Sequence, residues 1–138
     1  MSSWSNRYVG LSWTPDLYCG GLARLVYREQ LSIEIPDYGP APRDVRLWAP
    51  KIRAAAAAWP WVKLASNAVR NAFDLVVIER DDVDAHVGIA IGALDMLHIE
   101  RGRLSSIDAI EDPDWAGRIT GVYRHVALAH AAPLEAAA

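Results

Sequence analysis

Residues 16–30 read DLYCGGLARLVYREQ and set the chain's only cysteine, Cys19, directly in front of two glycines and an apolar repeat. Leu22, Leu25 and Val26 recur at helical spacing, so a helix is predicted to begin at this cysteine. A thiol at a helix start lies among unpaired backbone N–H groups and near the positive end of the helix dipole. Both favour the thiolate, so we expect the pKa of Cys19 to lie below its usual value of about 8.5. The structural alternative is a small buried side chain, the commoner role of a free cysteine.

The composition is that of an ordinary globular protein. The 138 residues are 52% hydrophobic and 22% charged, with a formal net charge of −3. This length predicts a single domain, residues 1–138, with a core of its own. The small net negative charge does not indicate a nucleic-acid-binding surface. One cysteine excludes an internal disulfide, and no Cys/His cluster has zinc-ligand spacing, so neither a metal nor a cofactor is expected.

No stretch has the pattern of a targeting or membrane segment. Residues 1–10, MSSWSNRYVG, lack the basic and apolar regions of a secretory signal. No apolar run approaches the ~20 residues that span a bilayer. We therefore expect a protein that is made in a cytoplasm and does not insert into a membrane.

The first half of the chain predicts helices separated by a loop. Residues 31–42, LSIEIPDYGPAP, carry the prolines and the glycine of a loop. Residues 43–59, RDVRLWAPKIRAAAAAW, predict an alanine-rich helix with one apolar face. Asp44 is expected to help start this helix, and Pro50 is expected to kink or divide it.

The second half has the β-branched and alternating patterns of strands. Strands are predicted within residues 73–80 (FDLVVIER), 86–92 (HVGIAIG), 96–102 (MLHIERG) and 118–125 (RITGVYRH). Residues 127–138, ALAHAAPLEAAA, have little to bury and are expected to fray. Helices followed by antiparallel strands predict an α+β fold, with N-terminal helices packed on an antiparallel β-sheet.

Two histidines, His86 and His98, fall in neighbouring predicted strands. In an antiparallel hairpin the numbers of directly opposite residues have a constant sum. A turn centred on Gly92 would set His86 opposite His98, with Cβ atoms roughly 5 Å apart, so that one imidazole could orient the other. A turn at residues 93–95 (ALD) would slip the two rings out of contact. We favour the turn centred on Gly92, since glycine accepts the positive φ of tight hairpin loops.

The chain contains, in order, a cysteine that could act as a nucleophile and two histidines that could act as its base and as the group orienting that base. A nucleophilic thiol needs a base, and the base needs a group that orients it. Cys19, His86 and His98 supply these at a helix start, in a strand and in the adjacent strand. His125 and His130 lie at or beyond the last predicted strand, and His130 is expected to be exposed and without a role. The candidate catalytic residues are therefore Cys19, His86 and His98.

Three stretches resemble the NlpC-type papain-like cysteine peptidases, in the phage tail-associated branch: YCGGLARLVYREQLSIEIPDYG, HVGIAIGALDMLHIERG and RITGVYRH. In that family a Cys-x-Gly-Leu-Val helix start carries the nucleophile, a His-Val-Gly-Ile strand carries the base, and a Leu-His on the next strand carries the orienting residue. Cys19, His86 and His98 match these positions. The resemblance implies a papain-like fold in which Cys19 starts the central helix.

The chain departs from the family around the nucleophile. The family usually has Asp before the cysteine and Ser or Trp after it, whereas this chain has Tyr18 and Gly20. Trp13 stands near the place where the family has an active-site Tyr. Trp13, Tyr18 and Gly20 are therefore the candidates for lining a substrate cleft.

The resemblance implies a peptidase that hydrolyses an amide bond in peptidoglycan stem peptides, between γ-D-glutamate and a diamino acid. Cys19 would attack the carbonyl carbon, His86 would carry the proton, and His98 would orient His86. The Cys19 backbone N–H would stabilise the oxyanion. The expected setting is a phage tail tip in the virion, with other tail-tip or hub proteins as partners and the bacterial cell wall as target.

Two alternatives remain open. The first is a structural or assembly protein of the tail tip with a vestigial triad, which the altered residues beside Cys19 favour. The second is a thiol acyltransferase on the same fold, with the same nucleophile.

Overall fold

A computed structural model describes residues 4–37, 39–80 and 83–131. In chain order its elements are η1 (Trp4–Tyr8), α1 (Cys19–Val26), the π-helix η2 (Tyr27–Leu31), η3 (Val45–Leu47), α2 (Trp48–Ala57), β1 (Trp61–Lys63), β2 (Leu75–Arg80), β3 (Val83–Ala90), β4 (Asp95–His98), β5 (Ser106–Ala109), η4 (Ala116–Arg118), β6 (Ile119–His125) and α3 (Val126–Ala131).

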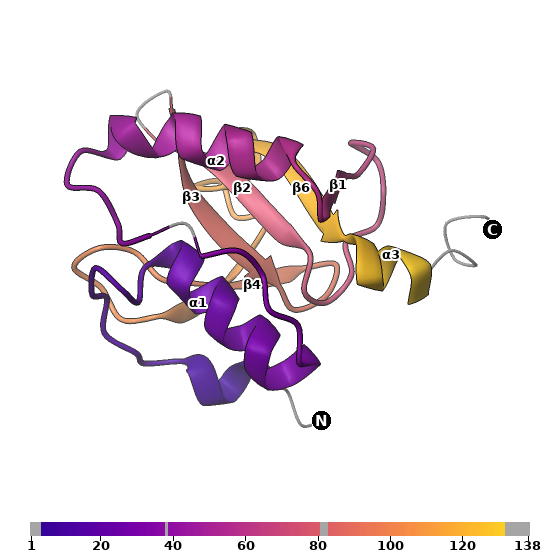
Figure 1. Cartoon of the computed structure of the whole chain (residues 1–138), viewed down its shortest axis with the longest axis horizontal. Coiled ribbons are helices and arrows are strands. Elements are labelled where there is room, and N and C mark those ends of the chain that lie inside the picture. The colour runs from indigo at the N-terminus through magenta and orange to yellow at the C-terminus, as the bar shows by residue number, and fades with distance from the viewer. Residues whose placement is uncertain (1–3, 38, 81–82, 132–138) are drawn as a thin grey trace.

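The strands form one antiparallel sheet in the order β1-β6-β2-β3-β4-β5. Helices α1 and α2 both lie in front of this sheet, with α2 above α1 in the view of Figure 1. The predicted α+β architecture, with N-terminal helices packed on an antiparallel sheet, is confirmed.

The face of the sheet toward α1 and α2 holds most of the core. Leu22 and Val26 of α1 pack against Ile89 of β3 and Leu97 of β4. Near the start of α1 a second cluster joins Cys19, Tyr18, Trp48, Ile52 and Val77. The alternation of side chains along a strand explains this arrangement, since Val77, Ile89 and Leu97 all point to the helical face.

The opposite face of the sheet is covered by the chain between β5 and β6. Val76, Ile78, Ala90 and Met96 pack there with Ile110 and Trp115. Because both faces are covered, residues 75–78 of β2 and 87–90 of β3 form continuous apolar runs in the sequence.

A buried ion pair fixes β6 to the start of β2. Arg124 donates from Nε to Asp74 Oδ1 (2.9 Å) and from Nη2 to Asp74 Oδ2 (2.8 Å), and Asp74 is fully buried. The Asp74 carboxylate also accepts the Asn71 backbone N–H (2.8 Å). Arg124 Nη2 donates further to the Val69 carbonyl (3.2 Å), so the pair also holds the loop between β1 and β2.

The expectations about the second helix need correction. Helix α2 is not divided by Pro50, which lies in its first turn, where the N–H groups have no partner within the helix. Asp44 acts one element earlier, since its Oδ1 accepts the Arg46 backbone N–H (2.9 Å) at η3.

The chain after β6 is helical as far as Ala131, so the expected fraying does not begin at residue 127. His125 is buried at the end of β6, where its Nδ1 accepts the Ala127 backbone N–H (3.1 Å). Burial lowers the pKa of His125. The side chain of His130 and residues 132–138 lie outside the described part.

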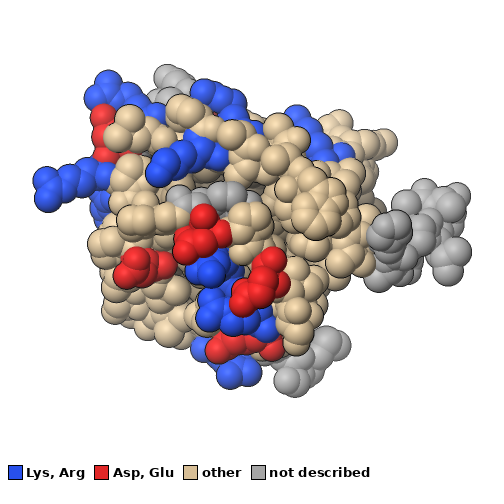
Figure 2. Space-filling view, in the orientation of Figure 1, with Lys and Arg blue, Asp and Glu red and all other residues tan. Residues whose placement is uncertain are grey.

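The surface over α1 and η2 mixes both signs of charge (Figure 2). Arg24 pairs with Asp37 at 3.5 Å, and Arg28 pairs with Glu34 at 3.7 Å. Within the described residues, no helix is long and apolar enough to cross a membrane.

Candidate active site

The start of α1 is built around Tyr18 and Cys19. Tyr18 is the N-cap residue, and its carbonyl accepts the Leu22 N–H (2.8 Å). Its ring packs against Trp48, with ring centroids 4.9 Å apart, and its hydroxyl donates to the Gly39 carbonyl. Tyr18 therefore ties the loop that follows η2 to the start of α1.

The two glycines after Cys19 allow other groups to approach the first turn of α1 closely. A Cβ added at Gly21 would lie 2.0 Å from the Asp16 carbonyl oxygen. A Cβ added at Gly20 would lie 2.7 Å from the Tyr18 ring. The loop before Cys19 thus folds back onto the helix start, in space that a side chain would otherwise occupy.

The Cys19 thiol is buried and protonated at neutral pH. Backbone N–H groups of Val87, Gly20 and Cys19 itself act on Sγ, and each lowers the pKa. Removal from water has the larger effect, so burial raises the pKa of Cys19 to about 11. The expectation of a lowered pKa is therefore wrong. The helix start supplies the expected N–H groups, but the surrounding core outweighs them.

His86 and His98 form a hydrogen-bonded chain that continues to a third residue. His86 Nε2 and His98 Nδ1 are 2.8 Å apart, which confirms the predicted contact between the rings. His98 Nε2 lies 2.6 Å from Asp108 Oδ2 on β5. Both imidazoles are buried, whereas the Asp108 side chain is 42% exposed. The chain thus runs from β3 through β4 to solvent at β5.

The predicted turn of the β3–β4 hairpin is wrong by one residue. Ile89 pairs with Leu97 and Ala90 with Met96, so the hairpin is centred on residue 93 rather than on Gly92. In this register His98 lies diagonally from His86 instead of directly opposite. Diagonal neighbours share a face and remain within reach of large side chains, which preserves the contact.

Trp115 covers the histidine pair on the face away from the helices. Its ring stacks on His86 at a centroid distance of 5.9 Å and meets His98 edge-on at 5.0 Å. The indole thereby separates the bond between the two imidazoles from water, which strengthens it.

Cys19 and the histidine pair lie on opposite faces of the sheet at β3. Val87 packs against the cluster that contains Cys19, on the helical face of the sheet. Because successive side chains of a strand point to opposite faces, the side chain of His86 points to the other face. Among the described residues, the structure gives no hydrogen bond from Sγ to an imidazole.

The Val87 N–H nevertheless brings Sγ to the level of the sheet. Directly after β3, the N–H of Ile91 points toward β4 and donates to the Asp95 carbonyl (2.8 Å), and by alternation the N–H of Val87 points the same way. Its partner there would be residue 99, but β4 ends at His98. The Val87 N–H that acts on Sγ thus lies where β4 has already ended, one residue along the strand from His86.

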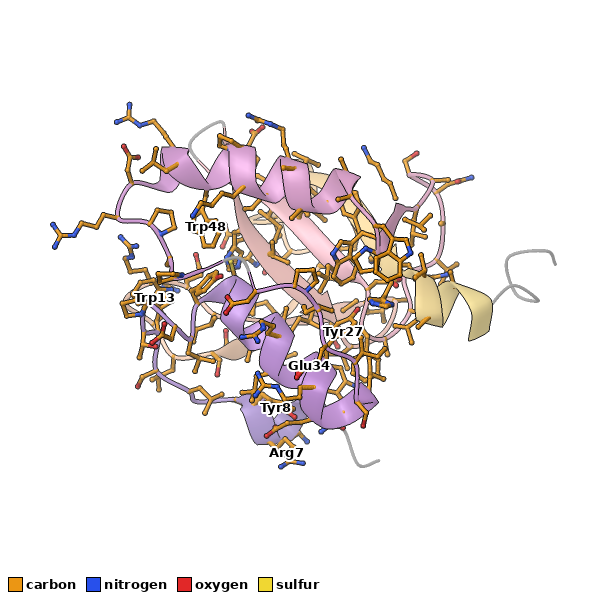
Figure 3. The ribbon with its side chains drawn as sticks, viewed as in Figure 1. Arg7, Tyr8, Trp13, Tyr27, Glu34 and Trp48 are labelled. Atoms are coloured by element: carbon orange, nitrogen blue, oxygen red, sulfur yellow. The ribbon has the colours of Figure 1, made fainter. Side chains whose placement is uncertain are left out.

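A cavity of about 70 Å³ adjoins the thiol between α1, α2 and the sheet. Of the three cleft candidates, Tyr18 and Gly20 line it, together with Trp48, Ile52 and Val87. Trp13 does not line this cavity, although it packs near Cys19 beside the start of α1 (Figure 3). The guanidinium of Arg101 instead lies over the ring of Trp13, 4.6 Å from the ring centroid.

Arg101 joins the loops around the helix start. Besides stacking on Trp13, it donates from Nη2 to the Pro42 carbonyl (2.9 Å) and from Nη1 to the Arg43 carbonyl (3.1 Å). The loop after β4 is thereby tied to the loop before α2.

Asp108 is the site residue that the sequence analysis missed. It lies in the short strand β5, whose four residues give too little periodicity to predict a strand or a face. The sequence does not give the register between β4 and β5, so it could not show that Asp108 lies beside His98. No group of three or more His, Cys, Asp or Glu side chains in the described ranges could hold a metal ion.

Comparison with known protein-family models finds no match, and no curated protein matches the chain.

Proposed function

We propose that this protein is a cysteine peptidase that hydrolyses an amide bond in peptidoglycan stem peptides, as part of a phage tail tip. The observation that carries the chemistry is the His86–His98–Asp108 chain beside a thiol at the start of α1. The class of substrate and the tail-tip setting rest on the resemblance of three sequence stretches to the NlpC-type peptidases.

The proposed reaction begins with a protonated thiol. Because the pKa of Cys19 is raised to about 11, the proton leaves Sγ as the new C–S bond forms rather than beforehand. His86 accepts this proton, and His98 holds the His86 ring in position. The carbonyl π electrons move to oxygen, which the backbone N–H of Cys19 at the helix start stabilises.

The second half of the reaction returns the enzyme to its starting state. The tetrahedral intermediate expels the amine, which takes the proton from His86, and a thioester remains on Cys19. Water, activated by His86, then hydrolyses the thioester and restores the thiol. The predicted bond lies between γ-D-glutamate and a diamino acid, and the predicted partners are other tail-tip or hub proteins.

A second candidate is a structural part of the tail tip without activity. The burial of Cys19 favours it, since the residue is only 6% exposed and the pKa of its thiol is raised. In that case Cys19 is a core residue and the histidine chain stabilises the sheet.

Digestion of purified peptidoglycan separates the two candidates. The parent protein should release muropeptides detectable by mass spectrometry, while Cys19→Ala and His86→Ala should release none. Thermal unfolding of all three proteins controls for folding. A folded parent protein that releases no muropeptides would favour the structural candidate, and release by Cys19→Ala would contradict the proposed mechanism.

A further inference from the structure

Asp108 lies at the end of the histidine chain, on the strand beyond His98. His98 of β4 pairs with Ser106 of β5, and Met96 pairs with Asp108, so His98 and Asp108 lie on the same face of the sheet. Asp108 Oδ2 is 2.6 Å from His98 Nε2, a short hydrogen bond, as bonds to a charged acceptor tend to be.

This contact determines which nitrogen of each ring carries a proton. A carboxylate only accepts hydrogen bonds, so His98 Nε2 donates to Asp108. In the neutral imidazole the other nitrogen, Nδ1, is then an acceptor. It is 2.8 Å from His86 Nε2, which must therefore be the donor. The remaining nitrogen of His86, Nδ1, then bears the lone pair that can accept a proton.

The opposite direction would leave His86 in the wrong form. If His98 carried its proton on Nδ1, it would donate to His86 Nε2, and neutral His86 would then carry its proton on Nδ1. That nitrogen could not accept the proton of a nucleophile. The carboxylate at β5 excludes this arrangement, although it touches neither His86 nor Cys19 in the described contacts.

We propose that Asp108 is a positioning residue that selects the basic tautomer of His86 through His98. This inference rests on the proposed function for its role in turnover, whereas the tautomers themselves can be measured without a substrate. The side chain lies on an edge strand and is half exposed, so its replacement should leave the core intact.

The first measurement is the ¹⁵N NMR spectrum of the histidine rings in the parent protein, in Asp108→Asn and in Asp114→Asn. Asp114 lines the same polar pocket as Asp108 and serves as a control for the loss of one negative charge there. In the parent and in Asp114→Asn, both histidines should carry the proton on Nε2. In Asp108→Asn, whose amide can donate as well as accept, the shifts should report a mixture of tautomers.

The second measurement is turnover of peptidoglycan by the same proteins and by Asp108→Glu. Asp108→Asn should lower kcat on the order of 10- to 100-fold, as for other partners that orient a functional histidine. Asp108→Glu retains the carboxylate and should recover part of the loss, while Asp114→Asn should match the parent.

The possible failures are distinguishable. Parent spectra with His98 protonated on Nδ1, or Asp108→Asn spectra identical to those of the parent, would overturn the role of Asp108 whatever the activity. If Asp108→Asn turned over like the parent while Cys19→Ala was inactive, the positioning role would be wrong and the proposed function would stand. If the parent released no muropeptides, the proposed function would fail, and the spectra alone would decide which tautomer Asp108 selects.

Discussion

At the scale of single residues, Cys19 shows how burial competes with the start of a helix. Three backbone N–H groups act on its Sγ and favour the thiolate, yet the surrounding side chains remove water from it and raise its pKa. The sequence places the thiol correctly at a helix start. The size of the desolvation could not be predicted, because it depends on Trp48, Ile52 and Val77, which come from distant parts of the chain.

The raised pKa of Cys19 makes the stability of the fold depend on pH. The unfolded chain loses the thiol proton near pH 9, whereas the folded protein keeps it until about pH 11. Above pH 9 the unfolded state therefore binds fewer protons, and the free energy of unfolding falls as pH rises. Between pH 8 and pH 10, the parent should lose roughly 1 kcal/mol relative to Cys19→Ser, which does not titrate there.

Urea unfolding of both proteins across this pH range measures the difference. The comparison with Cys19→Ser cancels the contribution of other groups, including Tyr27, whose pKa is also raised by burial. If the unfolding free energies of the two proteins changed with pH in parallel, the thiol would be hydrated in the folded state.

At the scale of elements, the start of α1 depends on close packing against the loop before it. Gly21→Ala would place a Cβ 2.0 Å from the Asp16 carbonyl oxygen, so the loop or the helix must move. We expect a loss of about 1–3 kcal/mol in unfolding free energy. Displacement of the thiol should also lower kcat about 100-fold.

Gly92→Ala is the matched control for this change. A Cβ at Gly92 meets nothing within 4 Å, and its backbone is not in the left-handed region. Thermal unfolding and turnover should therefore stay close to the parent values. If Gly21→Ala behaved like Gly92→Ala, the close approach of the loop would not matter for the site.

The buried ion pair between β2 and β6 gives a second prediction at this scale. Asp74→Asn removes the carboxylate and leaves the guanidinium of Arg124 buried without its charge partner, which should cost about 3–5 kcal/mol. Asp37→Asn breaks the exposed pair with Arg24 and should cost less than about 1 kcal/mol. Chemical denaturation of the two variants checks the contrast, and equal losses would contradict it.

Strand prediction succeeded where the apolar pattern was long. Strands β2 and β6 fall within the predicted stretches, whereas β3 and β4 overlap theirs and begin three residues and one residue earlier. Strands β1 and β5 have three and four residues, too few for a period to emerge, whereas β4, also of four residues, overlaps a longer patterned stretch at residues 96–102. The hairpin is centred on residue 93 rather than on Gly92. The predicted turn relied on a positive φ at Gly92, and Gly92 does not adopt one.

At the scale of the whole molecule, the site combines groups from the two faces of one sheet. The helical face provides Cys19, and the far face provides the histidine chain under Trp115. Both are linked to β3, Cys19 through the Val87 N–H and the histidine chain through His86, the preceding residue. The sequence predicted the histidine contact from strand spacing, but it could not reveal that Cys19 and His86 approach β3 from opposite faces. That relation depends on how α1 is packed, and no local pattern encodes it.

Trapping of a covalent intermediate tests most directly whether Cys19 and His86 cooperate in catalysis. The parent protein is mixed with a synthetic stem peptide containing the γ-D-glutamyl–diamino acid bond, quenched with acid and digested with trypsin. The peptide of residues 8–24, which contains Cys19, should gain the mass of the acyl half of the substrate and lose it on treatment with hydroxylamine. His86→Ala should show no such adduct. Cleavage of the peptide without any adduct on residues 8–24, and with the same rate in Cys19→Ala, would contradict the proposed mechanism.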